Sequence, residues 1–466
     1  MAIARLSEED RFMLWPDQRW PQHIGALAVL DGRRLVDSQG RFRLEDVRDA
    51  VAGRLHLVPR FRQLLQVPRL GMGGPLWVDA DRFDIRDHVE LVQLPSPAGE
   101  GELLAAVERL RARRLDHARP LWGMWFLPGL ADGRIGLYVK THHCVADGIA
   151  GMASLAAFLD AVPDVQPPPP HEDWTPERAP TAGELRGDSA RRHLAAGGRH
   201  LAALAHPVET IGRWRDSWPA VRELALETPG TATTLDRFIG PDRVLELVRT
   251  DLALMKAIGH AHSAKVNDVL LALIAAGLRA LLESRGELRP ETMVKIDVPI
   301  SLRLADRANA RGNLISMMVI PLAVGVADGH TRLRLIAAET ARRKAAGRPS
   351  LGGLPHGHLA AMVMLPLVAR QHVNVTSADL PGPEAPLYFA GAEVLELFPL
   401  LPLIGNVTLA VGALSYAGQF NVMVAADRDT YPDLGIFTAG LRQELAAFGA
   451  SSVASAIAAQ AMPSRR

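Results

Sequence analysis

The stretch RIGLYVKTHHCVADGIAGMASLAAFL, residues 134–159, passes from a strand pattern through a turn to a helix pattern. Apolar residues alternate with a period of two from Ile135 to Val139, which predicts a strand. From Ile149 to Leu159 they recur at helical spacing. The glycines between the two patterns tolerate the backbone conformations that a tight turn requires. The segment is therefore predicted to be a strand-to-helix unit of a mixed α/β protein.

The rest of the chain shows the same mixture of patterns. Residues 252–262 and 268–286 are predicted to form helices, and residues 293–300 alternate like a strand. Prolines concentrate in residues 163–180, where they favour an extended linker and exclude a helix or a sheet interior.

A chain of 466 residues is long for a single core, so two domains are expected. We predict an N-terminal domain over residues 1–162 and a proline-rich linker with a helical connection over residues 163–235. The second mixed α/β domain then covers residues 236–466.

Charge and composition restrict the possible partners and compartments. The 52 Lys and Arg residues nearly balance the 51 Asp and Glu residues, so nothing points to nucleic acid. No run of about 18 or more apolar residues occurs, and charges interrupt the N-terminus where a signal peptide needs an apolar core. The one cysteine, Cys144, is compatible with a reducing compartment. We therefore expect a cytoplasmic protein that does not span a membrane.

Two adjacent histidines at the end of the predicted strand are the strongest candidates for chemistry. Successive side chains on a strand point to opposite faces, so one histidine acts and the other supports. His143 is in register with Val139 and is predicted to be a general base, because an unperturbed imidazole titrates near neutral pH. Asp147, just before Gly148, can fold back toward the strand end to orient either the turn or a neighbouring cation. His142 is assigned the supporting role.

Other catalytic motifs are absent from the sequence. It lacks a GxSxG nucleophile elbow, a phosphate-binding GxxxxGK[ST] loop and an HExxH zinc motif. Cys144 is a poor nucleophile for His143, because neighbouring side chains on a strand diverge. Packed or metal-binding histidines are the alternative interpretation, but the remaining histidines show no ligand spacing, so no metal is expected.

HHCVADG, residues 142–148, matches the HHxxxDG signature of CoA-dependent acyltransferases such as chloramphenicol acetyltransferase and of peptide-synthetase condensation domains. Over nearly its whole length the chain resembles the bacterial wax ester synthase/diacylglycerol acyltransferase family. The blocks that carry the resemblance, in the order of the family, are LSEEDRFMLW, PQHIGALAVLDG, FDIRDHVELVQLP, RPLWGMWF, VNDVLLALIAAGLR, VPISLR, GNL, LPGPEAPLYFAGA and SYAGQFNVMVAADRDTYPD.

The resemblance implies a fold and a reaction. The fold is α/β, with two chloramphenicol-acetyltransferase-like domains and a substrate tunnel at their interface. The reaction is transfer of a long acyl chain from acyl-CoA to diacylglycerol or a fatty alcohol, with acyl-CoA as co-substrate and no other cofactor. An HHxxxDG enzyme with a different hydroxyl or amine acceptor, or a non-catalytic lipid-binding relative, are the alternatives.

Carried over to the matching positions, His143 is the base, His142 and Asp147 shape the motif, and Gly148 permits the turn. Asn267 is expected near the active site, although its place before a helix pattern equally suits an N-cap. Arg303 is expected either to pair with Asp147 across the domain interface or to be a surface or structural arginine.

Two further features bear on the substrate and on location. In the block usually read as NVPGP, Asp379 stands in place of the asparagine, which puts any role of that amide in doubt. Because the implied substrates are insoluble in water, the resemblance implies peripheral association with the inner membrane or with lipid droplets. The basic and aromatic segment 213–218, which contains Trp214 and Trp218, is the first candidate for that contact, and a solvated helix packed on the domain is the alternative.

Overall fold

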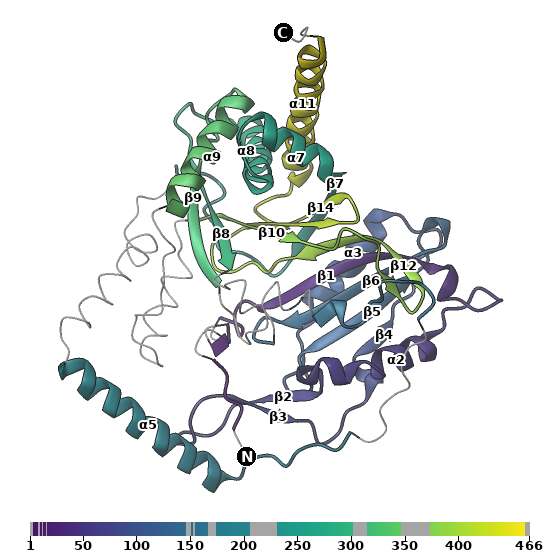
Figure 1. Ribbon diagram of the computed structural model, residues 1–466, viewed down its shortest axis with the longest axis vertical. Helices are drawn as coiled ribbons and strands as arrows, with labels where there is room; N and C mark the ends of the chain where they lie inside the picture. Colours follow the sequence, from purple (N-terminus) through teal and green to yellow (C-terminus); the bar gives the residue numbers. More distant parts are fainter. Residues whose placement is uncertain are drawn as a thin grey trace, which may run out of the picture.

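The structure is a computed structural model of the chain. It describes residues 3–7, 10–11, 13–14, 16–145, 151, 154–165, 174–205, 231–301, 315–345 and 373–461. These residues form two six-stranded sheets, a separate two-stranded ribbon and helices on the outer faces (Figure 1). The predicted mixed α/β fold class is confirmed.

The first sheet contains the histidine motif. Its strands, in spatial order, are β11 (Tyr388–Phe389), β12 (Ala392–Leu400), β1 (His23–Asp31), β6 (Arg134–His142), β5 (Trp122–Pro128) and β4 (Val89–Leu91). β1 and β6 are antiparallel along their whole length, and His23 lies opposite His142. The strand predicted from alternating residues is therefore confirmed as β6.

Helices cover both faces of this sheet because its strands are apolar on both sides. Val47 and Val51 of α2 (Leu44–Ala52) share a buried cluster with Leu30 of β1. On the other face, Val107 of α3 (Glu100–Ala112) shares a cluster with Val29. Short 3-10 helices connect these elements: η1 (Gly32–Arg34), η2 (Leu55–Leu57), η3 (Pro59–Arg62), η4 (Ile85–Asp87) and η5 (Ala131–Gly133).

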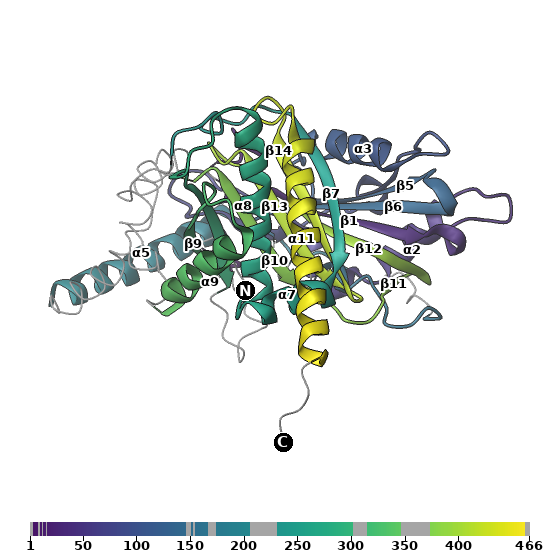
Figure 2. The same cartoon turned by 90° about the horizontal axis from the view of Figure 1, so that it is seen from above.

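The second sheet has a helical layer on its outer face (Figures 1 and 2). Its strands, in spatial order, are β7 (Arg243–Asp251), β14 (Gln419–Asp427), β13 (Leu409–Tyr416), β10 (Val375–Pro381), β8 (Val294–Ser301) and β9 (Ile315–Leu322). The helices of the layer are α7 (Leu252–Ala261), α8 (Val266–Ser284), α9 (Gly329–Ala345) and α11 (Leu434–Ala461). The two predicted helices and the predicted strand at residues 293–300 are confirmed as α7, α8 and β8.

The sheets do not divide the chain at one point in the sequence. β11 and β12 come from the C-terminal half but extend the first sheet, with β12 paired antiparallel to β1. β12 also crosses the second sheet, where a Cβ on Gly412 of β13 would lie 2.5 Å from the Pro399 carbonyl oxygen. The region 236–466 therefore supplies strands to both sheets, which residue patterns did not predict. The boundaries at 162 and 236 stay a prediction.

The two remaining elements lie apart from the sheets. β2 (Gln63–Gln66) and β3 (Leu76–Asp79) form an antiparallel ribbon. α5 (Ala182–Ala205) follows the linker and contains Gly197 and Gly198. Within the described ranges, every helix is too short or too polar to cross a bilayer.

Candidate active site

The two histidines of the motif are held in different ways at the end of β6. His142 is fully buried, and its backbone N–H donates to the Leu121 carbonyl oxygen at 3.0 Å. His143 is half-buried, and its N–H donates to the Gln22 carbonyl oxygen at 2.8 Å. The segments leading into β5 and β1 therefore fix the backbone of both residues, and His143 is the more accessible imidazole.

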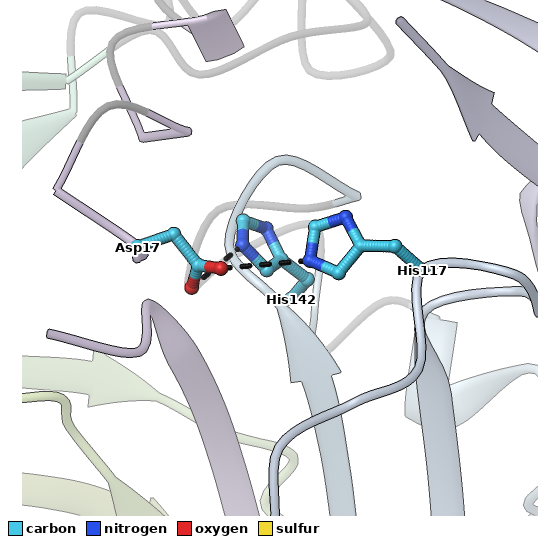
Figure 3. A group of neighbouring side chains, drawn as sticks. All are labelled: Asp17, His117 and His142. Atoms are coloured by element: carbon cyan, nitrogen blue, oxygen red, sulfur yellow. Dashed lines mark ion pairs between the residues drawn. The ribbon is translucent and has the colours of Figure 1, made fainter. Parts of the chain in front are cut away.

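A backbone donor and a carboxylate fix the ring of His142. Its Nδ1 accepts the N–H of Cys144 at 3.1 Å, and its Nε2 lies 3.1 Å from Oδ1 of Asp17 (Figure 3). Because Nδ1 is an acceptor, the neutral ring carries its proton on Nε2, facing the carboxylate. His142 is thus oriented to hold the turn, and in this arrangement its ring has no lone pair for a substrate proton.

The buried Asp17 is the centre of a small cluster that sequence reasoning missed. Its carboxylate also accepts the Gln22 N–H at 2.7 Å and lies 3.5 Å from Nε2 of His117. Burial alone raises the pKa of Asp17, but hydrogen bonds from His117, His142 and Gln22 outweigh it and hold that pKa far below its ordinary value. The carboxylate is therefore ionised at neutral pH.

Asp17, His117 and His142 also present ligand atoms within 4.8 Å of one another, as a metal site requires. However, His142 cannot donate a lone pair from Nε2 while its Nδ1 accepts the Cys144 N–H. The observed bonding fits an orienting hydrogen bond from the neutral His142 ring to the Asp17 carboxylate better than a metal site.

Two buried basic residues near His142, His23 and Lys140, have lowered pKa values. Burial, with smaller contributions from Lys140 and His142, lowers the pKa of His23 to about 3, so that ring is neutral. Burial also lowers the pKa of Lys140 to about 7, and its Nζ donates to the carbonyl oxygens of Leu110 and Arg113 at 2.7 and 2.6 Å. These contacts anchor the end of α3 to β6.

The Cys144 thiol is buried among apolar side chains. It is 3% exposed and lies in an apolar cluster with Leu6, Leu65, Trp77 and Leu121. Burial raises its pKa well above the ordinary value. A buried and protonated thiol is a poor nucleophile, which argues against an acyl-cysteine intermediate.

The other residues singled out in the sequence have different outcomes. Asp147, Gly148 and Arg303 lie outside the described residues. Asn267 lies in the first turn of α8, but Lys265 is the N-cap and its N–H donates to Asp268 Oδ2 at 2.8 Å. The N-cap interpretation of Asn267 is therefore wrong, because the helix begins at Val266, two residues earlier than predicted, and the Asp268 carboxylate caps it.

A pocket of about 560 Å³ lies beside that helix end. It is bordered by the start of α7 and α8 and by the ends of β10 and β13, and its lining includes Val266, Tyr416 and Asp379. The volume is within the range of small-molecule sites. The block SYAGQF forms the β13–β14 turn, where Ala417 and Gly418 have φ of +46° and +83°.

Asp379 is the one carboxyl on β10 in this lining. Burial raises its pKa to about 6, and no charged neighbour contributes to the shift. The following Gly382 packs so closely that a Cβ would lie 2.1 Å from the Ser415 carbonyl oxygen, so the turn of the LPGP block requires glycine. Asp379, which stands in place of the asparagine of the NVPGP block, therefore places a titratable carboxyl group in the wall of this pocket.

The arrangement of two six-stranded sheets is shared with solved structures. The chain is similar to a wax ester synthase/diacylglycerol acyltransferase from Marinobacter aquaeolei VT8, with a TM-score of 0.68 and 22% identity over 97% of this chain and 100% of that one. It is also similar to the starter condensation domain of rhizomide synthetase, with a TM-score of 0.59 and 14% identity over 97% and 95% of the two chains. At these identities the likeness shows the fold.

Sequence comparison identifies the family. Residues 6–270 match the wax ester synthase/diacylglycerol acyltransferase catalytic domain, and residues 311–448 match the C-terminal domain of the same family. A probable diacylglycerol O-acyltransferase, tgs1, of Mycobacterium tuberculosis is 30% identical over 432 residues, covering 91% of this chain and 90% of that protein. A putative diacylglycerol O-acyltransferase of Mycobacterium bovis has the same identity and coverage. The chain belongs to the wax ester synthase/diacylglycerol acyltransferase family and is an acyltransferase enzyme.

Proposed function

We propose that the protein transfers a long acyl chain from acyl-CoA to the hydroxyl of diacylglycerol or of a fatty alcohol. Family membership and the names of the relatives support this class of acceptor. The observation that carries the proposal is the different environment of the two histidines. His142 is locked by Asp17 and the Cys144 N–H, whereas His143 is half-buried at the end of the same strand.

In the proposed reaction His143 is the general base. It takes the proton from the acceptor hydroxyl while the hydroxyl oxygen attacks the thioester carbonyl carbon. The carbon–sulfur bond then breaks, and the departing CoA sulfur receives the proton from His143. Oxygen replaces sulfur on the acyl group, so the step needs no covalent enzyme intermediate and no cofactor other than the co-substrate acyl-CoA.

The remaining motif residues are assigned positioning roles. Asp147 and Gly148 shape the turn that follows His143, and Arg303 pairs with Asp147 across the interface between the halves. Asn267 contributes to substrate binding, which is supported by the pocket that its neighbour Val266 lines. We assign that pocket to one end of a tunnel between the two halves.

We also propose that the enzyme works at the cytoplasmic surface of the membrane or on lipid droplets. Diacylglycerol and fatty alcohols are insoluble in water, so the enzyme must meet them at a lipid surface. The sequence segment 213–218, first considered for this contact, lies outside the described residues.

The test is CoA release from a long-chain acyl-CoA with matched sets of diacylglycerols, fatty alcohols and amines. Ester formation with a lipid alcohol, lost in His143→Ala, is the expected result. Amide formation in preference to ester assigns the same machinery to a different acceptor. Absence of CoA release with every acceptor, from folded protein, would instead indicate a lipid-binding relative without turnover.

A further inference from the structure

The β2–β3 ribbon ends in an apolar tip that nothing in the described structure covers. The connection between the strands, residues 67–75, contains Val67 at 69% exposure and Leu70, which is fully exposed. The tip is short and contains Gly71 and Gly73, both with positive φ. Large aliphatic side chains on a projecting turn are disfavoured in water and gain free energy when an apolar phase takes them up.

The tip is held in a fixed position. Nη2 of Arg5 donates to the Met72 carbonyl oxygen at 2.8 Å, and another nitrogen of the same guanidinium donates to the Gly74 carbonyl oxygen. Nε of Arg5 donates to Asp188 of α5 at 3.0 Å. One guanidinium therefore joins the ribbon tip to α5, and Figure 1 shows both elements on the side of the molecule away from α8, α9 and α11.

The exposed side of α5, like the tip, carries an aliphatic side chain and arginines. Leu194 is 77% exposed, nine residues beyond the buried Leu185 and thus on the opposite side of the helix. Exposed arginines accompany the apolar residues on both elements: Arg69 on the tip and Arg186, Arg191 and Arg192 on the helix.

Acidic groups on the described part of this surface are already paired. Glu184 bonds to Arg178 at 2.8 Å, and Asp188 bonds to Arg5 and Arg192. The surface thus presents aliphatic side chains with a surplus of positive charge, which is the pattern of proteins that bind anionic lipid.

The base of the ribbon connects this surface to the active site. Leu65 of β2 and Trp77 of β3 are paired across the ribbon and pack with Cys144, the residue after His143. Leu70 is five positions beyond Leu65 in the chain, a reach of at most about 18 Å. The exposed tip is therefore within that reach of a residue that packs with Cys144.

We propose that the tip of residues 67–73 and the outer face of α5 form the surface that binds an anionic lipid bilayer. Val67 and Leu70 enter the acyl region, and the arginines contact the headgroups. This assignment deepens the proposed function and rests on it for its purpose, which is to bring water-insoluble acceptors close to His143.

The test uses the full-length protein and cosedimentation with phosphatidylcholine vesicles, with and without phosphatidylglycerol. The double variant Val67→Ser, Leu70→Ser is expected to bind vesicles about tenfold more weakly for each aliphatic side chain removed. Arg69→Glu with Arg191→Glu should weaken binding to the phosphatidylglycerol vesicles and flatten its dependence on salt. Leu335→Ser, at a 48% exposed leucine of α9, is the matched control and should bind like wild type.

Turnover separates this proposal from the proposed function. With a water-soluble short-chain acyl-CoA and a short alcohol, the double variant should match wild type, while its turnover of vesicle-borne diacylglycerol falls. If vesicle binding depends on the tip but the protein acylates none of the acceptors, the lipid-binding surface is supported and the proposed function is rejected.

Three results would overturn the surface assignment. The first is that the wild-type protein sediments with neither kind of vesicle. The second is that the double variant binds vesicles as well as wild type. The third is that the double variant changes self-association, measured by sedimentation velocity, and leaves vesicle binding unchanged.

Discussion

Replacing Asp17 tests whether a carboxylate outside the motif holds the motif in shape. Asp17 is 6% exposed and accepts from the Gln22 N–H at 2.7 Å, and it lies 3.1 Å from Nε2 of His142. Hydrogen bonds to a charged group contribute about 1.5–3 kcal/mol each, and a buried partner left without its hydrogen bond costs about 1–3 kcal/mol. We therefore expect Asp17→Ala to lower the free energy of unfolding by about 3 kcal/mol.

The assay is urea unfolding followed by tryptophan fluorescence, together with CoA release at a temperature where the variant is folded. Turnover of the folded variant should also fall, because the ring of His142 loses its orientation and the neighbouring His143 is displaced. Asp46→Asn, at an exposed carboxylate paired with Arg43, is the control and should change the unfolding free energy by less than about 1 kcal/mol.

The pH dependence gives a second measurement on the same residue. The pKa of Asp17 is lowered by folding, so its stabilising effect is complete above the unfolded-state pKa near 4 and is lost as the pH falls toward the folded-state value. The stability difference between wild type and Asp17→Asn should therefore be constant from about pH 7 to 5 and shrink below about pH 4. Wild-type stability and turnover in Asp17→Ala would refute the orienting role.

Three further predictions address the site. His143→Ala should lose about 10²–10⁴-fold in turnover with little change in melting temperature, and turnover near wild type would remove His143 as the base. Cys144→Ala should retain substantial activity, whereas an acyl-thioester on Cys144 detected by mass spectrometry would contradict direct transfer. Folding raises the pKa of Asp379 to about 6, so its carboxylate costs stability as the pH rises from about 4 to 6; Asp379→Asn should then be more stable than wild type above pH 6, by up to about 2 kcal/mol. If wild type and Asp379→Asn have equal free energies of unfolding at both pH 5 and pH 8, Asp379 is well solvated.

Local patterns were sufficient for the strand that leads into the motif. The alternation from Ile135 to Val139 reports a strand directly, because period-two burial depends only on the strand itself. The same rule placed His142 and His143 in different environments. The structure agrees, with one ring fully buried and the other half-buried.

The partners of those residues could not be read in the same way. Asp17 and His117 reach His142 through the fold, and neither belongs to a recognisable motif. The start of α8 was misplaced by two residues, because Asp and Asn side chains both suit a helix start and only the hydrogen bond of Lys265 to Asp268 separates them. The burial that raises the pKa of Asp379 likewise depends on the packing of distant segments.

The pairing of the late strand β12 with the early strand β1 has a consequence for biosynthesis. About 250 residues separate the end of β6 from the start of β12, the strand that completes the other side of β1. At about 5–20 residues per second, a ribosome needs roughly 13–50 s to make that stretch. During this time the edge of β1 has no partner, and an open strand edge is a template for aggregation. The nascent chain is therefore expected to need chaperone protection until residue 400 has emerged, and slower synthesis should lengthen the interval in which this edge is exposed.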